Sequence, residues 1–266
     1  METLFKHFDT LAWECDVKLD TIEKIAFEKF SNISKQCSCN KKIIRLIGQS
    51  GSGKTTQLLP TAKAKFKQAK QEPLHLCVRE FASLHPRYKE IVEENGKEQA
   101  REKTNGFALR TLVFCLFWAI EKGIDILLEM TFLTVFFENM FQKWLKRRKY
   151  SAIFLCVAVN IEISNQFIQK RLASKNSQES GRVVLKRSID FFDKQLTQGL
   201  QLLQQGNSKQ RIVIWNVFDQ DCKFDGWVGK CLPIFLQERE KIGCTLTDER
   251  RLLQAKIYYF CYKSGS

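Results

Sequence analysis

The sequence predicts an α/β fold in which a parallel sheet carries helices on both faces. Two observations lead to this prediction. An apolar run at 43–47 leads directly into the glycine-rich segment 48–53 and then into helix-forming residues up to about Lys70. Strand-like apolar runs also alternate with helical segments along most of the 266 residues. Such alternation is typical of βαβ units, whose strands are parallel.

The segment 48–55 reads Gly-Gln-Ser-Gly-Ser-Gly-Lys-Thr and fits the phosphate-binding pattern G-x-x-x-x-G-K-[ST] in its strand–loop–helix context. Its glycines allow several backbone N–H groups to point at one anion, and the following helix adds the positive end of its dipole. Lys54 supplies a charge for the terminal phosphates of ATP, and Thr55 supplies a hydroxyl for Mg²⁺. We therefore expect ATP and Mg²⁺ as cofactors. The expected ATP contacts are Gly48, Gln49, Ser50, Gly51, Ser52, Gly53, Lys54, Thr55 and Thr56.

The other strands and helices follow from apolar periodicity. The predicted strands are 43–47, 74–78, 124–129, 151–159 and 211–215. The helices predicted between them are the segment up to Lys70, a charged helix ending near 101, and the segments 107–122, 134–148, 163–172 and 182–205. Ligands of such sheets bind beyond the carboxyl ends of the strands. The second strand ends at Arg79 and Glu80, and the third ends at Glu129, Met130 and Thr131. We expect these residues to lie near the phosphate-binding loop.

The chain divides into three regions. Residues 1–40 carry apolar residues at helical spacing and form an expected helical N-terminal extension. Residues 41–220 contain the alternating strands and helices and form the main domain. Residues 221–266 form an expected C-terminal helical extension, whose first residues lie in a turn predicted over 219–229.

The chain is basic, with 43 Lys and Arg against 29 Asp and Glu and a formal net charge of +14. Because most basic residues are scattered, a solvated basic surface is the favoured interpretation; docking of an acidic partner and nucleic-acid binding remain alternatives, in that order. The ten cysteines show no disulfide spacing, and the longest apolar stretch, 109–120, is too short to cross a bilayer. We expect a cytoplasmic protein without a membrane partner.

An ordered set of motifs between about 43 and 215 resembles the zeta toxin family. The phosphate-binding loop is close to the family's G-Q-x-G-S-G-K, and the third strand ends in a Glu-x-Thr that is similar to its E-G-T. An aromatic residue precedes a His-Pro-x-Tyr segment after the second strand, and two arginines follow the fourth strand. The residues concerned outside the loop are Phe81, His85, Pro86, Tyr88, Glu129, Thr131, Arg171 and Arg182.

The resemblance implies a P-loop kinase-like fold and an ATP-dependent kinase that acts as the toxin of a toxin–antitoxin system. Members of this type phosphorylate the 3′-hydroxyl of the aminosugar in UDP-N-acetylglucosamine, and a small helical antitoxin blocks their ATP site. Carried over to this chain, Lys54, Arg171 and Arg182 neutralise charge on the transferring phosphate. His85, Glu129 and Thr131 then lie on the substrate side.

One departure from the family's pattern affects the chemistry. Where the family has an aspartate that acts as general base, this chain has Arg79, and a guanidinium cannot accept a proton. Arg79 is instead a candidate for binding a substrate phosphate, with an ordinary surface arginine as the alternative. Glu80 is the candidate replacement base, although its side chain would face the other way if the strand continued through it. The alternatives are a shifted acceptor, such as another nucleotide, NAD or an RNA end, and an ATP-binding protein without turnover.

Overall fold

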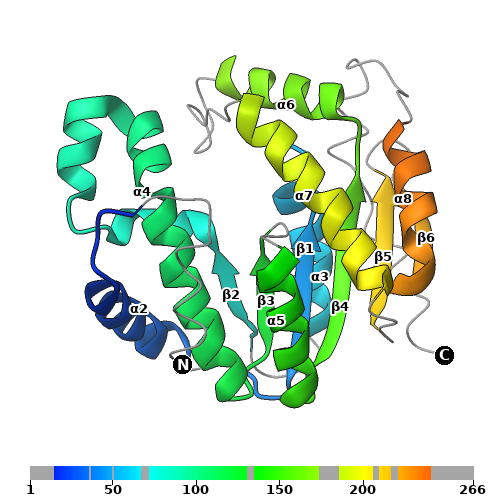
Figure 1. The fold of residues 1–266 in the computed structure, drawn as a ribbon, viewed down its shortest axis with the longest axis horizontal. Helices are drawn as coiled ribbons and strands as arrows, with labels where there is room; N and C mark the ends of the chain where they lie inside the picture. Colours follow the sequence, from blue (N-terminus) through cyan, green and yellow to red (C-terminus); the bar gives the residue numbers. More distant parts are fainter. Residues whose placement is uncertain are drawn as a thin grey trace.

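The computed structural model describes residues 15–35, 37–49, 51–66, 72–130, 135–173, 186–205, 210–216 and 221–240. Within these residues one six-stranded sheet has the order β2-β3-β1-β4-β5-β6 (Figure 1). Five strands are parallel: β1 (Lys42–Ile47), β2 (Leu74–Cys77), β3 (Ile126–Glu129), β4 (Ser151–Ala158) and β5 (Arg211–Asn216). The strand β6 (Asp221–Trp227) pairs antiparallel with β5. The predicted α/β fold is thus confirmed.

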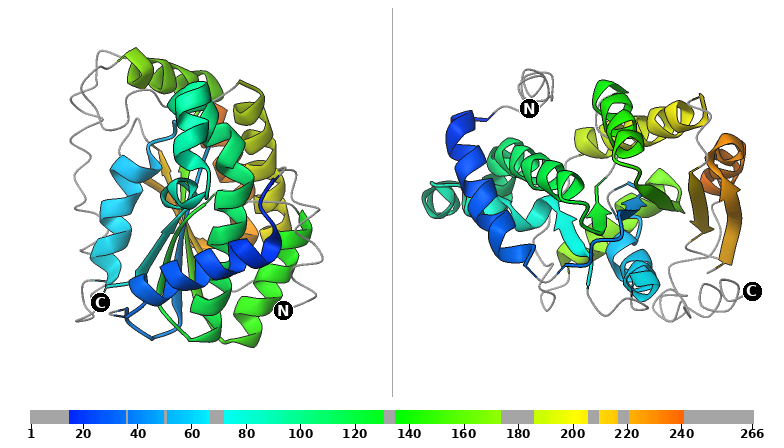
Figure 2. Two further views of the ribbon diagram at one scale, coloured as in Figure 1. Left: turned by 90° about the vertical axis from the view of Figure 1, so that its left-hand side faces the viewer. Right: turned by 90° about the horizontal axis from the view of Figure 1, so that it is seen from below.

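Helices cover both faces of the sheet, as Figure 2 shows from two further directions. Alternate residues of each strand point to opposite faces, so Ile43 and Ile47 of β1 join one apolar cluster, whereas Ile44 and Leu46 join the other. The first cluster includes buried residues of α2, α4, α5, α7 and α8, and the second those of α3 and α6. The bounds are α2 Leu19–Ile33, α3 Leu59–Phe66, α4 Tyr88–Glu121, α5 Val135–Arg147, α6 Ile161–Ala173, α7 Lys186–Gln205 and α8 Cys231–Glu240.

Two expected features of the chain differ in the structure. The turn expected over 219–229 is wrong where β6 lies, because pairing with β5 makes an edge strand of a polar, Gly-containing segment. The expected C-terminal helical extension therefore begins with a strand, and of its remaining residues the structure describes a short turn and α8. The expected helices, one ending near 101 and one over 107–122, divide at a different place: the helical part of α4 is interrupted at Gly96, whose φ of 76° and ψ of 161° are not helical, and the part after it runs without a break to Glu121.

The described part of the expected N-terminal extension is the helix α2, which packs on α4. Its buried face consists of Ile22, Ala26 and Phe30, spaced four residues apart. Phe30 also lies 5.8 Å, centroid to centroid, from the ring of Trp118 on α4. This helix therefore belongs to the same core as the sheet.

A buried ion pair interrupts the first apolar cluster. The guanidinium of Arg45 on β1 donates hydrogen bonds of 2.6 and 2.7 Å to the carboxylate of Glu138 on α5, and the two side chains are 1% and 2% exposed. Arg45 Nε also donates to the carbonyl oxygen of Met130 at 3.3 Å. Because Met130 directly follows β3, this ion pair ties the end of that strand to the neighbouring strand and to α5.

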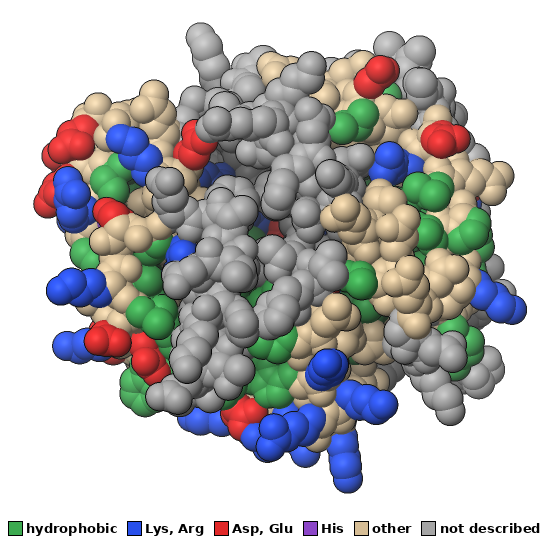
Figure 3. All heavy atoms as spheres, viewed as in Figure 1, with side chains coloured by type: hydrophobic (Ala, Val, Ile, Leu, Met, Phe, Trp, Pro, Cys, Tyr) green, Lys and Arg blue, Asp and Glu red, His purple; other side chains and the backbone are tan. Residues whose placement is uncertain are grey.

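The basic side chains on the face shown in Figure 3 lie mainly along the margins of its described surface, with acidic side chains among them at the left. Among the described residues, no helix combines the length and the apolar character needed to cross a membrane.

Candidate nucleotide and acceptor site

The phosphate-binding loop follows β1 and leads into a turn of π-helix, Lys54–Leu58, which continues as α3. Gly51 and Gly53 have φ of 81° and 85°, in the left-handed region that favours glycine. A Cβ at Gly51 would lie 2.5 Å from the carbonyl oxygen of Ser164, so the loop also needs glycine there for space. Ser50 lies outside the described residues, and Thr56 is described only as part of the π-helical backbone.

The side chain of Gln49 holds the loop against the start of α6. Its Nε2 donates to the carbonyl oxygen of Val159 at 3.1 Å and to the hydroxyl of Ser164 at 2.7 Å. The side chains of Gln49 and Ser52 are both buried. The Nε2 group of Gln49 is therefore bonded to the protein.

The ammonium group of Lys54 lies over the loop that precedes it. Its Nζ donates hydrogen bonds to the carbonyl oxygens of Gly48 at 2.6 Å and Gln49 at 2.7 Å. The positive charge is thus held at the carboxyl end of β1, where the motif predicts the terminal phosphates.

Three side chains meet beside Lys54: Thr55 from the π-helical turn, Glu129 from the end of β3 and Arg79 from the 3₁₀ turn after β2. We call them the Thr55–Glu129–Arg79 cluster. The Thr55 hydroxyl donates to Glu129 Oε1 at 2.6 Å. Arg79 Nη2 lies 3.2 Å from both of these oxygens and 3.4 Å from Glu129 Oε2. The structure therefore brings together the sequence-predicted residues at the ends of β2 and β3 with the phosphate-binding loop.

The cluster keeps Glu129 ionised. Burial alone would raise the pKa of its carboxyl, but the contacts with His75 and Thr55 and the charges of Arg79 and Lys54 lower that pKa to about 2. Hydroxyl and carboxylate oxygens are the hard donors that Mg²⁺ prefers. Thr55 and Glu129 thus fit a magnesium site in donor chemistry. No group of three or more His, Cys, Asp and Glu suited to a metal ion occurs among the described residues.

His75 was not identified from the sequence, yet it links two of the predicted residues. Its Nε2 lies 3.7 Å from Glu129 Oε2, beyond hydrogen-bond distance, and its Nδ1 lies 3.6 Å from Glu80 Oε1. The strand β2 ends at Cys77 and residues 78–80 form a 3₁₀ turn, so Glu80 is not constrained by strand alternation. The only available signal was that His75 lies two residues before a buried strand end.

His85 lies in a different environment. Its buried ring lies 3.0 Å, at Nε2, from Asp16 Oδ1, and its Nδ1 accepts a hydrogen bond from the backbone N–H of Arg87. The ring also stands edge-on to Phe107, with centroids 5.0 Å apart. The contacts of His85 thus join the turn before α4 to the N-terminal segment and to α4 itself.

Three further predicted residues receive no side-chain description. Arg171 lies on α6, two residues before that helix ends, and only its backbone is described. Thr131 and Arg182 lie outside the described residues.

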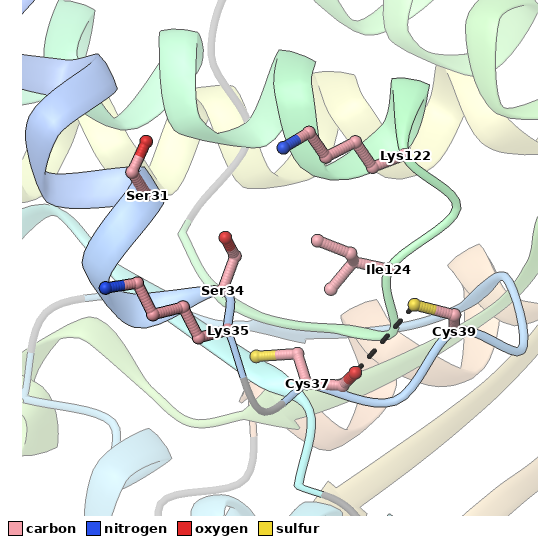
Figure 4. A pocket seen from close by; sticks show the side chains of 7 residues that line it. All are labelled: Ser31, Ser34, Lys35, Cys37, Cys39, Lys122 and Ile124. Atoms are coloured by element: carbon pink, nitrogen blue, oxygen red, sulfur yellow. Dashed lines mark hydrogen bonds between the residues drawn. The ribbon is translucent and has the colours of Figure 1, made fainter.

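A separate hollow of about 530 Å³ lies before the amino ends of β1 and β3, away from the cluster. Figure 4 shows that its side chains come from the end of α2, the segment before β1 and the end of α4. The lining residues are Ser31, Ser34, Lys35, Cys37, Cys39, Lys122 and Ile124. Because substrates of such sheets bind at the carboxyl ends, this hollow is not part of the candidate site.

Comparisons with known proteins agree with this arrangement. A structure of the PezAT chromosomal toxin–antitoxin system of Streptococcus pneumoniae is similar, with a TM-score of 0.66 and 22% identity over 90% of this chain and 94% of that one. A structure of AvrRxo1-ORF1:AvrRxo1-ORF2 with ATP has a TM-score of 0.51 and 11% identity, covering 86% of this chain and 73% of that one. These likenesses show the shared fold. No match was found among curated proteins.

The model of the zeta toxin family matches residues 28–226. The match includes α3 to α7, β1 to β5, β6 up to Gly226, the phosphate-binding loop and the Thr55–Glu129–Arg79 cluster. The chain has the fold of a P-loop kinase-like toxin, and it belongs to the zeta toxin family.

Proposed function

We propose that this protein is an ATP- and Mg²⁺-dependent phosphotransferase that moves the γ-phosphate of ATP to a hydroxyl of a nucleotide-sugar. The observation that carries this proposal is the Thr55–Glu129–Arg79 cluster beside Lys54, because a cation, a hydroxyl and a carboxylate converge there at the carboxyl ends of three parallel strands. Family membership favours the 3′-hydroxyl of UDP-N-acetylglucosamine as the acceptor.

Different groups in and beside the loop are proposed to contact the phosphates and the Mg²⁺ of the bound nucleotide. Backbone N–H groups of 48–55 bind the phosphates, and the Lys54 ammonium exchanges its carbonyl partners for the terminal phosphates. Thr55 and Glu129 hold Mg²⁺, which neutralises charge on the phosphates when it is bound. The similar solved structure of AvrRxo1-ORF1:AvrRxo1-ORF2 with ATP supports this choice of nucleotide.

Glu80 is the proposed general base. Its side chain is 49% exposed, so an acceptor hydroxyl can reach it, and His75 faces its carboxylate from within the sheet. Arg171 and Arg182 are proposed to neutralise charge on the transferring phosphate, and Thr131 to contact the acceptor. The buried contacts of His85 with Asp16 and Phe107 favour an architectural role for that residue instead.

A shifted acceptor is the second candidate. The guanidinium of Arg79 lies at the end of β2, where the family's base is an aspartate, and guanidinium groups bind phosphates well. Another nucleotide, NAD or an RNA end would offer such a phosphate. A shifted acceptor therefore fits the same cluster.

We also propose a small helical antitoxin as the partner, because the family and the PezAT neighbour belong to toxin–antitoxin systems.

The proposed location is the cytoplasm. The cysteines that the structure describes are free thiols, which fits a reducing compartment.

The test is a phosphoryl-transfer assay with labelled ATP, Mg²⁺ and an acceptor panel. The panel contains UDP-N-acetylglucosamine, other nucleotide-sugars, NAD and a short RNA, and mass spectrometry identifies the product. We expect labelled UDP-N-acetylglucosamine with the wild type and none with Lys54→Ala. Label on NAD or RNA alone would establish the shifted acceptor, and transfer by Arg79→Asp but not by the wild type would show that the base has been lost.

A further inference from the structure

We propose that Arg79 is a built-in cation of the metal site, which Mg²⁺ must displace when the nucleotide binds. The inference rests on the proposed function, since it concerns how the same site loads its nucleotide. It assigns Arg79 a role before catalysis, as a guanidinium that holds the site closed to metal until Mg²⁺ and nucleotide arrive together.

The geometry places the guanidinium on the oxygens that fit the metal. Arg79 Nη2 is 3.2 Å from the Thr55 hydroxyl oxygen and 3.2 Å from Glu129 Oε1, which are themselves 2.6 Å apart. One nitrogen therefore faces both donors at once. The Glu129 side chain is 6% exposed, so its charge is balanced chiefly by groups of the protein.

Two cations cannot occupy this position together. Arg79 Nη2 lies 3.2 Å from the Thr55 hydroxyl oxygen, so a metal held by that oxygen at about 2.0–2.1 Å would lie within roughly 5 Å of the same nitrogen. Mg²⁺ needs the same oxygen and a tight octahedral shell, and a guanidinium a few ångströms away would repel it. Binding of the metal therefore requires that Arg79 leave.

Arg79 is placed so that it can leave. Its side chain is 26% exposed, four times the fraction of Glu129, and its residue lies in the 3₁₀ turn after β2, outside the strand ladder. Its Nε lies 3.4 Å from Cys77 Sγ, which is a weak acceptor. Leaving the cluster thus breaks no strand pairing.

The alternative is a static ion pair, in which Arg79 merely supports Glu129. The two roles differ in how nucleotide binding depends on Mg²⁺. A displaced cation competes with the metal, so its removal lowers the Mg²⁺ concentration that binding requires. A guanidinium that stays in place supports Glu129 and repels the bound metal by its charge alone, so Arg79→Lys, which keeps the charge, would then retain the wild-type Mg²⁺ requirement.

The experiment measures binding of a fluorescent, non-hydrolysable ATP analogue to the full chain across a series of Mg²⁺ concentrations at constant ionic strength. We expect Arg79→Gln to lower the half-saturating Mg²⁺ concentration roughly tenfold, since a charge-assisted hydrogen bond is lost that the metal otherwise has to break. Arg79→Lys keeps the positive charge but lacks the planar guanidinium group. Its half-saturating Mg²⁺ concentration is therefore expected to lie between those of the wild type and Arg79→Gln.

Arg211→Gln is the matched control. Arg211 also forms a two-bonded pair with a carboxylate, that of Asp225, but it lies at the amino end of β5, away from the cluster. Its variant is expected to have the Mg²⁺ dependence of the wild type.

The outcomes separate this inference from the proposed function. An unchanged or raised Mg²⁺ requirement in Arg79→Gln, with nucleotide still bound, overturns the displaced cation and leaves the kinase proposal standing. A folded wild type that binds no nucleotide at any Mg²⁺ concentration overturns the proposed function itself. If circular dichroism shows that Arg79→Gln is unfolded, Arg79→Lys is the deciding variant. A half-saturating Mg²⁺ concentration below that of the wild type supports the inference, and an equal or higher one contradicts it.

Discussion

The hydroxyl of Thr55 lies 2.6 Å from Oε1 of Glu129 and joins the phosphate-binding loop to the carboxyl end of β3. β3 pairs directly with β1, which leads into that loop, so both residues are positioned by adjacent strands of one sheet. A hydrogen bond to a carboxylate is stronger than one between neutral groups. The loop is therefore held against the sheet edge where substrate is expected.

The low pKa of Glu129 predicts an acid-sensitive fold. Its pKa falls from 4.5 to about 2, so its contribution to the free energy of unfolding is complete above about 4.5 and is lost as the pH falls towards 2. This contribution is on the order of 3 kcal/mol. Urea unfolding at about pH 6 and about pH 3 should show a smaller loss of stability for Glu129→Gln than for the wild type. Equal losses in the two proteins, with Glu162→Gln as an exposed control, would contradict this origin.

Glu80→Gln should slow phosphoryl transfer about 10²- to 10⁴-fold, because an amide cannot accept the acceptor's proton. Binding of ATP and Mg²⁺ should not change, since Glu80 faces His75 and not the loop. Glu90→Gln removes an exposed carboxylate paired with Arg87 and serves as the control. A wild-type rate in Glu80→Gln would mean that another group takes the proton.

His85→Ala should destabilise the fold without weakening nucleotide binding. The substitution removes a buried ring that accepts a hydrogen bond from the N–H of Arg87 and contacts Asp16, a loss of roughly 1–3 kcal/mol. Urea unfolding gives the stability, and nucleotide titration gives the affinity. Weaker acceptor binding at an unchanged free energy of unfolding would instead show that His85 contributes to the acceptor site, as the family resemblance suggests.

The buried pair of Arg45 and Glu138 predicts strongly non-additive stability changes. Arg45→Met leaves the Glu138 carboxylate buried without its cation and should cost about 3–5 kcal/mol. Adding Glu138→Leu should recover most of that loss, because no charge then remains in the apolar cluster. Denaturant unfolding of both single variants and the double variant measures the coupling. Additive losses would show that the two side chains act independently.

Features that depend on short stretches of the chain could be predicted from the sequence. The glycine spacing of 48–53 followed by Lys54 identified the loop, and the continuous apolar run of β4 identified a buried parallel strand. The position of Glu129 at a strand end was enough to place it beside the loop. Each of these predictions depends only on residues close together in the chain.

Features that depend on tertiary contacts could not be predicted. The strand β6 exists because β5 offers it an edge, and the kink at Gly96 depends on a φ that the sequence does not specify. The approach of His75 to Glu80 requires that β2 end at Cys77, whereas apolar periodicity extends the strand to Val78. Arg45 lies in an apolar strand, and only the distant Glu138 explains its burial.

The most direct measurement compares acceptor-dependent release of ADP from ATP by the wild type and by Lys54→Ala, with UDP-N-acetylglucosamine and Mg²⁺ present. The proposed kinase predicts ADP formation that rises with acceptor concentration in the wild type and is absent in Lys54→Ala, because the ammonium held by Gly48 and Gln49 is lost. Equal ADP formation by the two proteins, with or without acceptor, would contradict the assignment of the phosphate-binding loop to phosphoryl transfer.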